Sequence, residues 1–185
     1  MPLTNQNTEQ LLLLCLAGNQ RAQLEIYNRY YKAMYNSAIR IVNDPYKAED
    51  IMQESFLTAF TKLNSLKDKN TFGAWLKRIV INNSIQDYNK NSKHNEVALD
   101  NVLYKVEDES GIESSSLEHD KIKHVMRTIE SLKENYKVAI TLHLIEGYDY
   151  EEIGEIMNIS YANCRTLVSR AKESLRKKLQ PMAEI

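Results

Sequence analysis

The chain is poor in the residues that interrupt helices and in those that build disulfide frameworks. Its 185 residues include only 5 glycines, 3 prolines and 2 cysteines. Leucine, isoleucine, glutamate, lysine and asparagine are plentiful instead, and this balance favours an all-α protein. Cys15 and Cys164 lie in apolar helical contexts far apart in the chain, so we expect two small core residues and no disulfide.

The sequence also lacks the common signatures of catalysis, metal binding and membrane insertion. It has no Cys-x-x-Cys or His-Glu-x-x-His pattern, no glycine-rich phosphate loop and no nucleophile elbow. The apolar run Leu11–Leu14 is far too short to span a bilayer. We therefore expect no metal, no cofactor, no enzymatic activity and no membrane segment, in a cytoplasmic protein.

A large excess of one charge is missing as well. The formal net charge is −1, so any nucleic-acid binding must come from local patches. Residues 1–90 carry 11 basic and 8 acidic side chains, residues 91–120 carry 2 and 8, and residues 121–185 carry 11 and 9. An acidic segment thus separates two near-neutral or basic regions, which indicates two domains joined by a linker.

Apolar residues recur at helical spacing on both sides of the acidic segment. Thr8 is the expected cap of the first helix, and Leu24 and Leu57 are expected to face the core. Weak periodicity predicts a flexible linker over residues 91–116, with a short helical turn near residues 97–103. The helices expected from spacing are residues 8–16, 20–42, 46–63, 71–89, 117–131 and 134–146, with a further helical pair after Gly147.

Residues 150–179 form the most informative segment. Its first part places apolar residues three and four apart, which predicts a short helix. Asn158-Ile159 is the expected turn, and Ser160 is the expected N-cap of the next helix. A buried stripe at i, i+4, i+7 and i+11 follows in that helix. The stripe consists of Cys164, Val168, Ala171 and Leu175.

This pair of helices has two interpretations. Ordinary amphipathic hairpins show the same spacing, so the pattern alone leaves both open. Charge decides between them, because residues 160–180 contain six lysines and arginines against one acid. A solvated structural face usually mixes charges of both signs, whereas a face that meets phosphates does not. The charge therefore favours a helix-turn-helix whose second helix enters the DNA major groove.

A second surface is predicted on the helix that follows Pro45. Four polar residues fall on one exposed face there, because their spacings of one, four and five residues make them helical neighbours. They are Glu49, Asp50, Gln53 and Glu54. From charge alone this is an ordinary solvated face. The functional alternative is a docking surface for a basic or polar partner helix.

Three stretches together carry a family resemblance. They are Ala48-Glu-Asp-Ile-Met-Gln-Glu-Ser-Phe-Leu57, Phe72-Gly-Ala-Trp75-Leu-Lys-Arg-Ile-Val-Ile-Asn82, and residues 147–170. In this order they resemble the polymerase-binding helix, the −10 recognition helix and the −35-reading helix-turn-helix of sigma-70-type factors, specifically the extracytoplasmic-function or group-four members. The resemblance covers an N-terminal domain at residues 8–90 and a C-terminal domain at residues 117–180.

The resemblance implies a sigma factor that binds core RNA polymerase and promoter DNA, with an anti-sigma factor as a further partner. It assigns the polar loop of residues 64–70 to a pocket for a base flipped from the non-template strand. Polymerase contact is implied for Glu49, Asp50, Gln53 and Glu54. Contact with −10 DNA is implied for Lys67, Lys69, Lys77, Arg78 and Asn82. Contact with −35 DNA is implied for Asn163, Arg165, Thr166, Ser169 and Arg170.

The chain departs from the family pattern after the −10 helix. Where relatives usually have a run of arginines, residues 85–94 contain only Lys90 and Lys93. Fewer cations release fewer counterions, so phosphate attraction from this region should be weaker. Ser169 also stands where relatives often carry larger side chains, which leaves the −35 sequence open.

Two other functions remain open from the residues alone. A stand-alone helix-turn-helix regulator would bind duplex DNA tightly without polymerase, and it would leave the Glu49–Glu54 pattern without a use. An adaptor that binds only proteins would have no use for the cationic second helix. Such an adaptor would give no DNA footprint.

Overall fold

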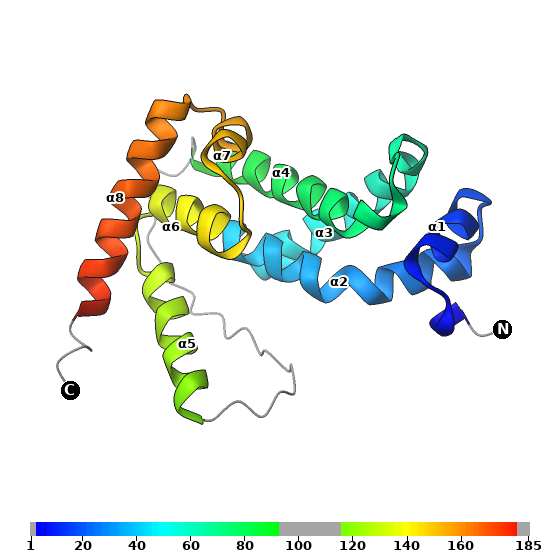
Figure 1. Ribbon diagram of the computed structural model, residues 1–185, viewed down its shortest axis with the longest axis horizontal. Coiled ribbons are helices and arrows are strands. Elements are labelled where there is room, and N and C mark those ends of the chain that lie inside the picture. Colours follow the sequence, from blue (N-terminus) through cyan, green and yellow to red (C-terminus); the bar gives the residue numbers. More distant parts are fainter. Residues whose placement is uncertain (1–2, 93–115, 181–185) are drawn as a thin grey trace. The chain divides into compact units, whose positions relative to one another are not determined.

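The computed structural model describes residues 3–92 and 116–180, and every regular element in those ranges is a helix (Figure 1). The predicted all-α class is therefore confirmed. The chain divides into two compact units between Ala98 and Leu99. The predicted linker at residues 91–116 and its helical turn near residues 97–103 lie outside the described residues, except for their ends. Residues 91 and 92 close the last helix of the first unit, and residue 116 opens the first helix of the second.

The first unit is a bundle of four α-helices with three short 3₁₀ turns. Its elements are η1 (Leu3–Asn5), α1 (Thr8–Leu16), α2 (Gln20–Val42), α3 (Pro45–Thr61), η2 (Leu63–Ser65), η3 (Lys69–Thr71) and α4 (Phe72–Ser92). Side chains just before the helices fix where they begin. Asp44 accepts hydrogen bonds from the backbone of Tyr46 and Lys47, and Pro45 fills the first helical position, where its missing N–H costs nothing.

One continuous apolar core joins all four α-helices of the first unit. Leu12, Ile26, Phe56, Phe72 and Leu76 are among its buried members. Aromatic rings line it in stacked, tilted and edge-on pairs, and the edge-on pair is Tyr30 with Phe72, whose ring centroids lie 5.3 Å apart. The loop between α3 and α4 is anchored to this same core, because its leucines at 63 and 66 are buried there.

Three sequence predictions in the first unit were wrong in detail. The cap of α1 is Asn7, not Thr8, because the Asn7 side chain accepts from the Gln10 backbone at 2.8 Å and the Gln10 side chain accepts in return. Leu24 and Leu57 do not face the core, since they are 59% and 68% exposed. Each lies opposite the buried stripe of its helix, a position that local apolar spacing does not distinguish.

The second unit builds its core around the last helix. Its elements are α5 (Ser116–Glu130), α6 (Glu134–Ile140), η4 (Thr141–Ile145), α7 (Tyr150–Met157) and α8 (Tyr161–Leu179). The predicted single helix at residues 134–146 changes to a π-helical turn at η4. Ile129, Ile140 and Leu175 pack together between α5, α6 and α8. Lys178 adds a polar tie from α8, donating to the carbonyl and hydroxyl oxygens of Ser131 at 2.8 and 3.0 Å.

Among residues 120–180 of the second unit, one charged side chain is buried. Lys137 on α6 is only 8% exposed, among neighbours that include the buried Val138 and Ile140. Burial lowers the pKa of its ammonium group, and the carboxylates of Glu130 and Glu134 only partly offset that shift. The folded protein therefore binds this proton less tightly than the unfolded chain does.

Replacing Lys137 with methionine should stabilise the second unit at neutral pH. The unfolded chain keeps the lysine charged up to about pH 10.5, so the desolvation cost of the charge is fully present at pH 7 and falls as pH rises through the lowered pKa. We expect Lys137→Met to raise the free energy of unfolding by about 1 kcal/mol at pH 7.

Urea unfolding at pH 7 and near pH 10 would test this expectation. The advantage of the methionine variant should shrink at the higher pH, because the wild type then loses the proton. The exposed Lys123→Met is the matched control and should change stability little. An advantage that stays constant or grows with pH would contradict the account.

Candidate nucleic-acid and partner interfaces

The turn between α7 and α8 has the local geometry of a helix-turn-helix. Asp149 caps α7 by accepting from the Glu152 backbone at 2.8 Å, and the Glu152 side chain accepts from the Asp149 backbone at 3.0 Å. Asn158 ends α7 in the left-handed conformation with φ 54°. A Cβ atom at Gly154 would lie 3.1 Å from the carbonyl oxygen of Ile159, so this tight turn favours glycine there. Ser160 then caps α8, as predicted.

The buried stripe of α8 confirms the predicted register. Its four residues, Cys164, Val168, Ala171 and Leu175, are all buried. Burial raises the pKa of the Cys164 thiol, and the nearby Asp149 carboxylate raises it further. Burial also raises the pKa of the Cys15 thiol, to about 11. Both cysteines are thus protonated core residues at neutral pH.

The opposite face of α8 is exposed and polar. All five residues predicted to contact −35 DNA, Asn163, Arg165, Thr166, Ser169 and Arg170, are exposed. Arg165 and Arg170 make no hydrogen bond or ion pair with another residue in the described part of the chain, so both guanidinium groups remain available. Five positions of an α-helix separate them by about 140° around the axis. They therefore flank the face on which Thr166 and Ser169 lie.

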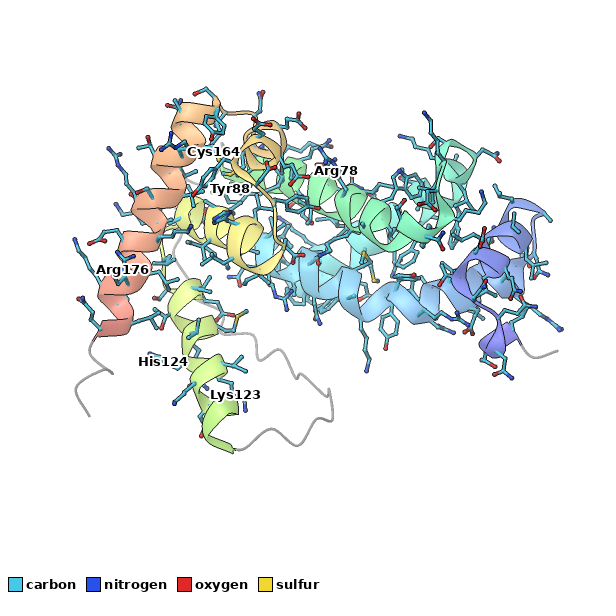
Figure 2. The ribbon with its side chains drawn as sticks, viewed as in Figure 1. Arg78, Tyr88, Lys123, His124, Cys164 and Arg176 are labelled. Atoms are coloured by element: carbon cyan, nitrogen blue, oxygen red, sulfur yellow. The ribbon has the colours of Figure 1, made fainter. Side chains whose placement is uncertain are left out.

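The cations of α8 are not equivalent. Glu173 pairs with Arg176 at 2.8 Å and with Lys177 at 3.5 Å, and Lys178 is tied to Ser131. These pairs occupy the C-terminal half of the helix, where Figure 2 labels Arg176. Arg165 near the start of α8, Arg170 at its middle and Lys172 have no such partner among the described residues. A count of charges along the sequence did not reveal this division.

A shallow hollow of about 570 Å³ lies along the C-terminal half of α8. Tyr136 of α6 lines it on one side. The α8 residues that line it are Ser169, Arg170, Lys172, Glu173, Ser174, Arg176 and Lys177. Hydroxyl groups and cations predominate among these lining residues, and both are hydrogen-bond donors that phosphate oxygens accept from.

The predicted −10 residues of α4 fall on two different faces. Arg78 and Asn82 lie one turn apart and share a face with the exposed Gln86. Lys77 precedes Arg78 by one position, so it points about 100° away around the helix. Arg78, labelled in Figure 2, and Lys77 each already interact with other residues, and both are half-buried. Asn82 is fully on the surface.

The loop of residues 64–70, here called the −10 loop, is held by its own hydrogen bonds. Asp68 accepts from the Asn70 backbone at 2.9 Å, and its carbonyl accepts from the Thr71 hydroxyl at 2.7 Å. Lys67 is exposed near the middle of the loop, and Lys69 is half-buried at the start of η3. The loop therefore presents Lys67 from a defined backbone.

The four predicted polymerase-binding residues form one exposed surface on α3. Glu49, Asp50, Gln53 and Glu54 are all exposed, and the Gln53 amide donates to the Glu49 carboxylate at 3.2 Å. On the other side of α3, Ser55 accepts from the Asn83 amide of α4 at 2.9 Å, which fixes α3 against its neighbour.

Sequence reasoning missed two apolar members of this α3 surface. Tyr46 is 79% exposed and Leu57 is 68% exposed. Together with Asp50 and Gln53 they follow the spacing i, i+4, i+7 and i+11, which makes one continuous row along the helix. That spacing was present in the sequence, but the apolar character of Leu57 suggested the core. We define the α3 row as Tyr46, Asp50, Gln53 and Leu57.

Within residues 3–92 and 116–180, no three histidine, cysteine or acidic side chains gather where they could hold a metal ion. None of the helices in the described part of the chain is both long and apolar enough to cross a membrane.

Two family models match the chain. One, described as Sigma-70 region 2, matches residues 26–94, and the other, Sigma-70 region 4, matches residues 123–175. The "ECF RNA polymerase sigma-E factor" of Salmonella typhimurium is 30% identical over 189 residues, which is 97% of this chain and 98% of the relative. The Escherichia coli K12 protein of the same name is also 30% identical with the same coverage. The "RNA polymerase sigma-H factor" of Pseudomonas aeruginosa is 28% identical, with 97% of each chain covered.

Two solved structures share the fold. The sigma factor RpoE of Bartonella quintana, in complex with the anti-sigma factor NepR, matches with a TM-score of 0.57 and 22% identity, over 93% of this chain and 96% of that one. CnrH in complex with the cytosolic domain of CnrY matches with a TM-score of 0.54 and 20% identity, over 95% of this chain and 98% of that one.

Proposed function

The chain belongs to the extracytoplasmic-function group of the sigma-70 family, and from this premise we propose that its two units divide promoter recognition between them. As a sigma factor, the protein directs RNA polymerase to promoters at transcription initiation. The N-terminal domain, residues 8–90, would bind core polymerase and open the −10 element. The C-terminal domain, residues 117–180, would read −35 DNA as duplex.

The observation that carries this proposal is the division of α8 into a buried and an exposed face. The buried stripe fixes α8 against its own unit, and the exposed face offers two unpaired arginines beside Thr166 and Ser169. Arg165 and Arg170 could each give a bidentate contact to guanine or a contact to phosphate. The short side chains between them allow the helix to approach the groove closely. The hollow beside Tyr136 would accept a backbone phosphate.

The −10 surface is proposed on the −10 loop and on α4. Lys67 and Lys69 of the loop, and Lys77, Arg78 and Asn82 of α4, are the proposed contacts. Arg78 and Asn82 share one face and would meet the same strand, whereas Lys77 points elsewhere and would contact a different phosphate. Unstacking a base costs only a few kcal/mol, so a loop with a fixed backbone could trap the flipped base without ATP.

The polymerase-binding surface is proposed on α3. Its four polar residues could pair with a basic partner helix, and the exposed Tyr46 and Leu57 would add apolar area at both ends of the α3 row. Two large apolar side chains on the same exposed row favour a docking face over an ordinary solvated one. A stand-alone DNA-binding regulator would leave this row without a use.

We further propose that an anti-sigma factor regulates the protein. RpoE of Bartonella quintana has the same fold and is held by the anti-sigma factor NepR, which supports a partner of this class. We also propose that the protein itself carries no enzymatic activity and acts inside the cytoplasm, where RNA polymerase is found.

The −35 assignment can be tested with arginine substitutions. Arg165→Ala and Arg170→Ala should each weaken holoenzyme binding to a −35 duplex, by about 1–3 kcal/mol where the arginine contacts guanine, with relaxed preference at one base pair. A phosphate contact would instead give a uniform loss over all sequences and a shallower salt dependence. Binding would be measured over a library of −35 sequences at several salt concentrations.

Arg127→Ala is the matched control for this experiment. It removes the same charge from an exposed position of the same unit, on α5, and should leave −35 binding unchanged. Full binding by both α8 variants would exclude this helix as the DNA reader.

The polymerase assignment can be tested on the α3 row. The double variant Asp50→Ala, Gln53→Ala should compete poorly for core polymerase while its helicity by circular dichroism stays the same. Leu57→Ser should also weaken assembly without loss of stability, because the side chain is already in water.

The double variant Glu9→Ala, Gln86→Ala serves as the control. It removes one carboxylate and one amide from exposed helix positions of the same unit but away from α3. If the α3 variants compete for core polymerase as well as the wild type does, the assignment of this face is wrong.

A further inference from the structure

The −10 loop is held to the first unit at both of its ends. At its start, Leu63 and Leu66 are buried in the core beside Leu11 and Leu12 of α1, and α1 packs against both η2 and η3. At its end, Phe72 is fully buried as the first residue of α4. The position of the loop therefore depends on α1 at one end and on the beginning of α4 at the other.

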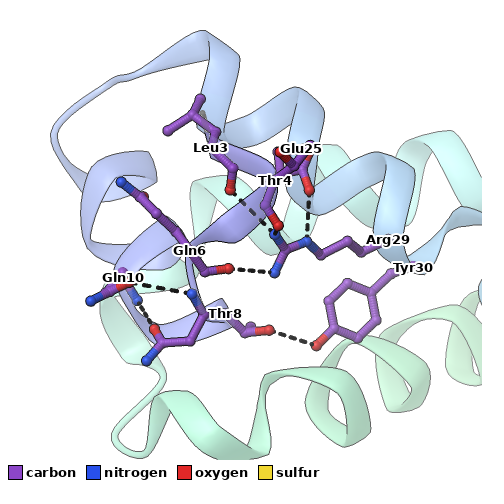
Figure 3. A network of polar contacts seen from close by, with 9 residues as sticks. Leu3, Thr4, Gln6, Thr8, Gln10, Glu25, Arg29 and Tyr30 are labelled. Carbon is purple, nitrogen blue, oxygen red and sulfur yellow. Dashed lines mark hydrogen bonds and ion pairs between the residues drawn. The ribbon is translucent and has the colours of Figure 1, made fainter. Parts of the chain in front are cut away.

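Tyr30 of α2 contacts both of these supports. Its ring meets that of Phe72 edge-on, with centroids 5.3 Å apart. It also covers Gly73 so closely that a Cβ atom there would lie 3.1 Å from Tyr30 Cε1. Its hydroxyl lies 3.4 Å from the hydroxyl of Thr8, the first residue of α1 (Figure 3). One side chain thus joins the beginning of α1 to the beginning of α4.

Arg29, next to Tyr30, fixes the chain that leads into α1. Its guanidinium donates to the carbonyl oxygens of Gln6, Thr4 and Leu3 at 2.8, 3.0 and 3.3 Å. Its Nε donates to the Glu25 carboxylate at 2.8 Å, which orients the guanidinium from the same helix (Figure 3). Three of the four directed bonds from this planar group hold η1 and the following turn on α2, an arrangement that a lysine could not reproduce.

We propose that Tyr30 is a positioning residue for promoter opening, with Arg29 in support: it joins the start of α1 to the start of α4, the two elements that hold the −10 loop, and so sets where Lys67 and Lys69 meet the displaced strand. The inference rests on the proposed −10 role of that loop. Neither Tyr30 nor Arg29 touches DNA in this account. They act through α1, η3 and the first turn of α4.

The test uses the full-length protein and separates loop position from DNA opening. Tyr30→Leu removes the ring and the hydroxyl, and Gly73→Ala pushes on the ring from the other side. Arg29→Gln removes the guanidinium bonds to Leu3, Thr4 and Gln6 without disturbing a buried side chain of the core. Tyr31→Leu is the matched control. Tyr31 is also a half-buried tyrosine of α2, but it stacks on Tyr27, with ring centroids 5.8 Å apart, and no ring contact joins it to Phe72.

Amide hydrogen exchange over residues 64–71 reports how firmly the loop is held, and a fluorescent base analogue in the −10 element reports opening by the holoenzyme. Tyr30→Leu and Gly73→Ala should raise loop exchange and slow opening, each on the order of tenfold. Arg29→Gln should act in the same direction. Competition for core polymerase should be unchanged in all three. Tyr31→Leu should lower global stability without changing loop exchange or opening well below the melting temperature.

Several outcomes would overturn the inference. One is normal loop exchange in Tyr30→Leu, and another is the same defect in Tyr31→Leu, which would indicate general destabilisation. A variant whose loop exchanges faster but whose holoenzyme opens the promoter normally would also overturn the inference. The double variant Lys67→Ala, Lys69→Ala tests the −10 role separately. If it opens promoters normally, the proposed function of the loop fails, and hydrogen exchange alone then decides whether Tyr30 holds the loop.

Discussion

An α-helix in a small bundle can bury one stripe, and the remaining surface must face outward. With 3.6 residues per turn, the buried stripe of α8 at Cys164, Val168 and Ala171 determines that Thr166 and Ser169 point away from the core. The same geometry applies to α3, where burial of Ile51 and Ser55 leaves Asp50 and Gln53 exposed. The faces proposed on α3 and α8 are thus each the reverse side of a core stripe, and core packing sets their orientation.

The sequence was informative wherever a local pattern and the tertiary structure agree. The all-α class, the bounds of α2 and the register of α8 follow from apolar spacing and from caps such as Ser160. Leu57 was misplaced because its apolar character suggested burial, although its position lies opposite the buried stripe of α3. The π-helical turn and the burial of Lys137 depend on how α6 packs against its neighbours, which no local pattern encodes.

The positive charges of α8 differ in their surroundings, although the sequence alone does not show it. Counted along the chain, the six lysines and arginines of residues 160–180 are equivalent. In the structure, Glu173 pairs with Arg176 and Lys177, and Lys178 binds Ser131 at the end of α5. Arg165, Arg170 and Lys172 have no such partner in the described part of the chain. Exposed ion pairs contribute little stability, so the pairing matters mainly for the direction in which each side chain points. Arg165 and Arg170 are therefore not held toward another side chain in the described part of the chain, and the side chains between them on that face, Thr166 and Ser169, are short.

The π-helical turn at Thr141–Ile145 affects how this unit can tolerate changes in length. Such a turn contains one residue more than the α-helical turn it replaces. Deleting one residue there would let the segment revert to ordinary α-helix, because η4 directly continues α6. The same deletion within α8 would rotate everything beyond it by about 100° and break the register of its buried stripe. A one-residue deletion at η4 would instead be absorbed before the loop of residues 146–149, so the stripe of α8 would keep its register.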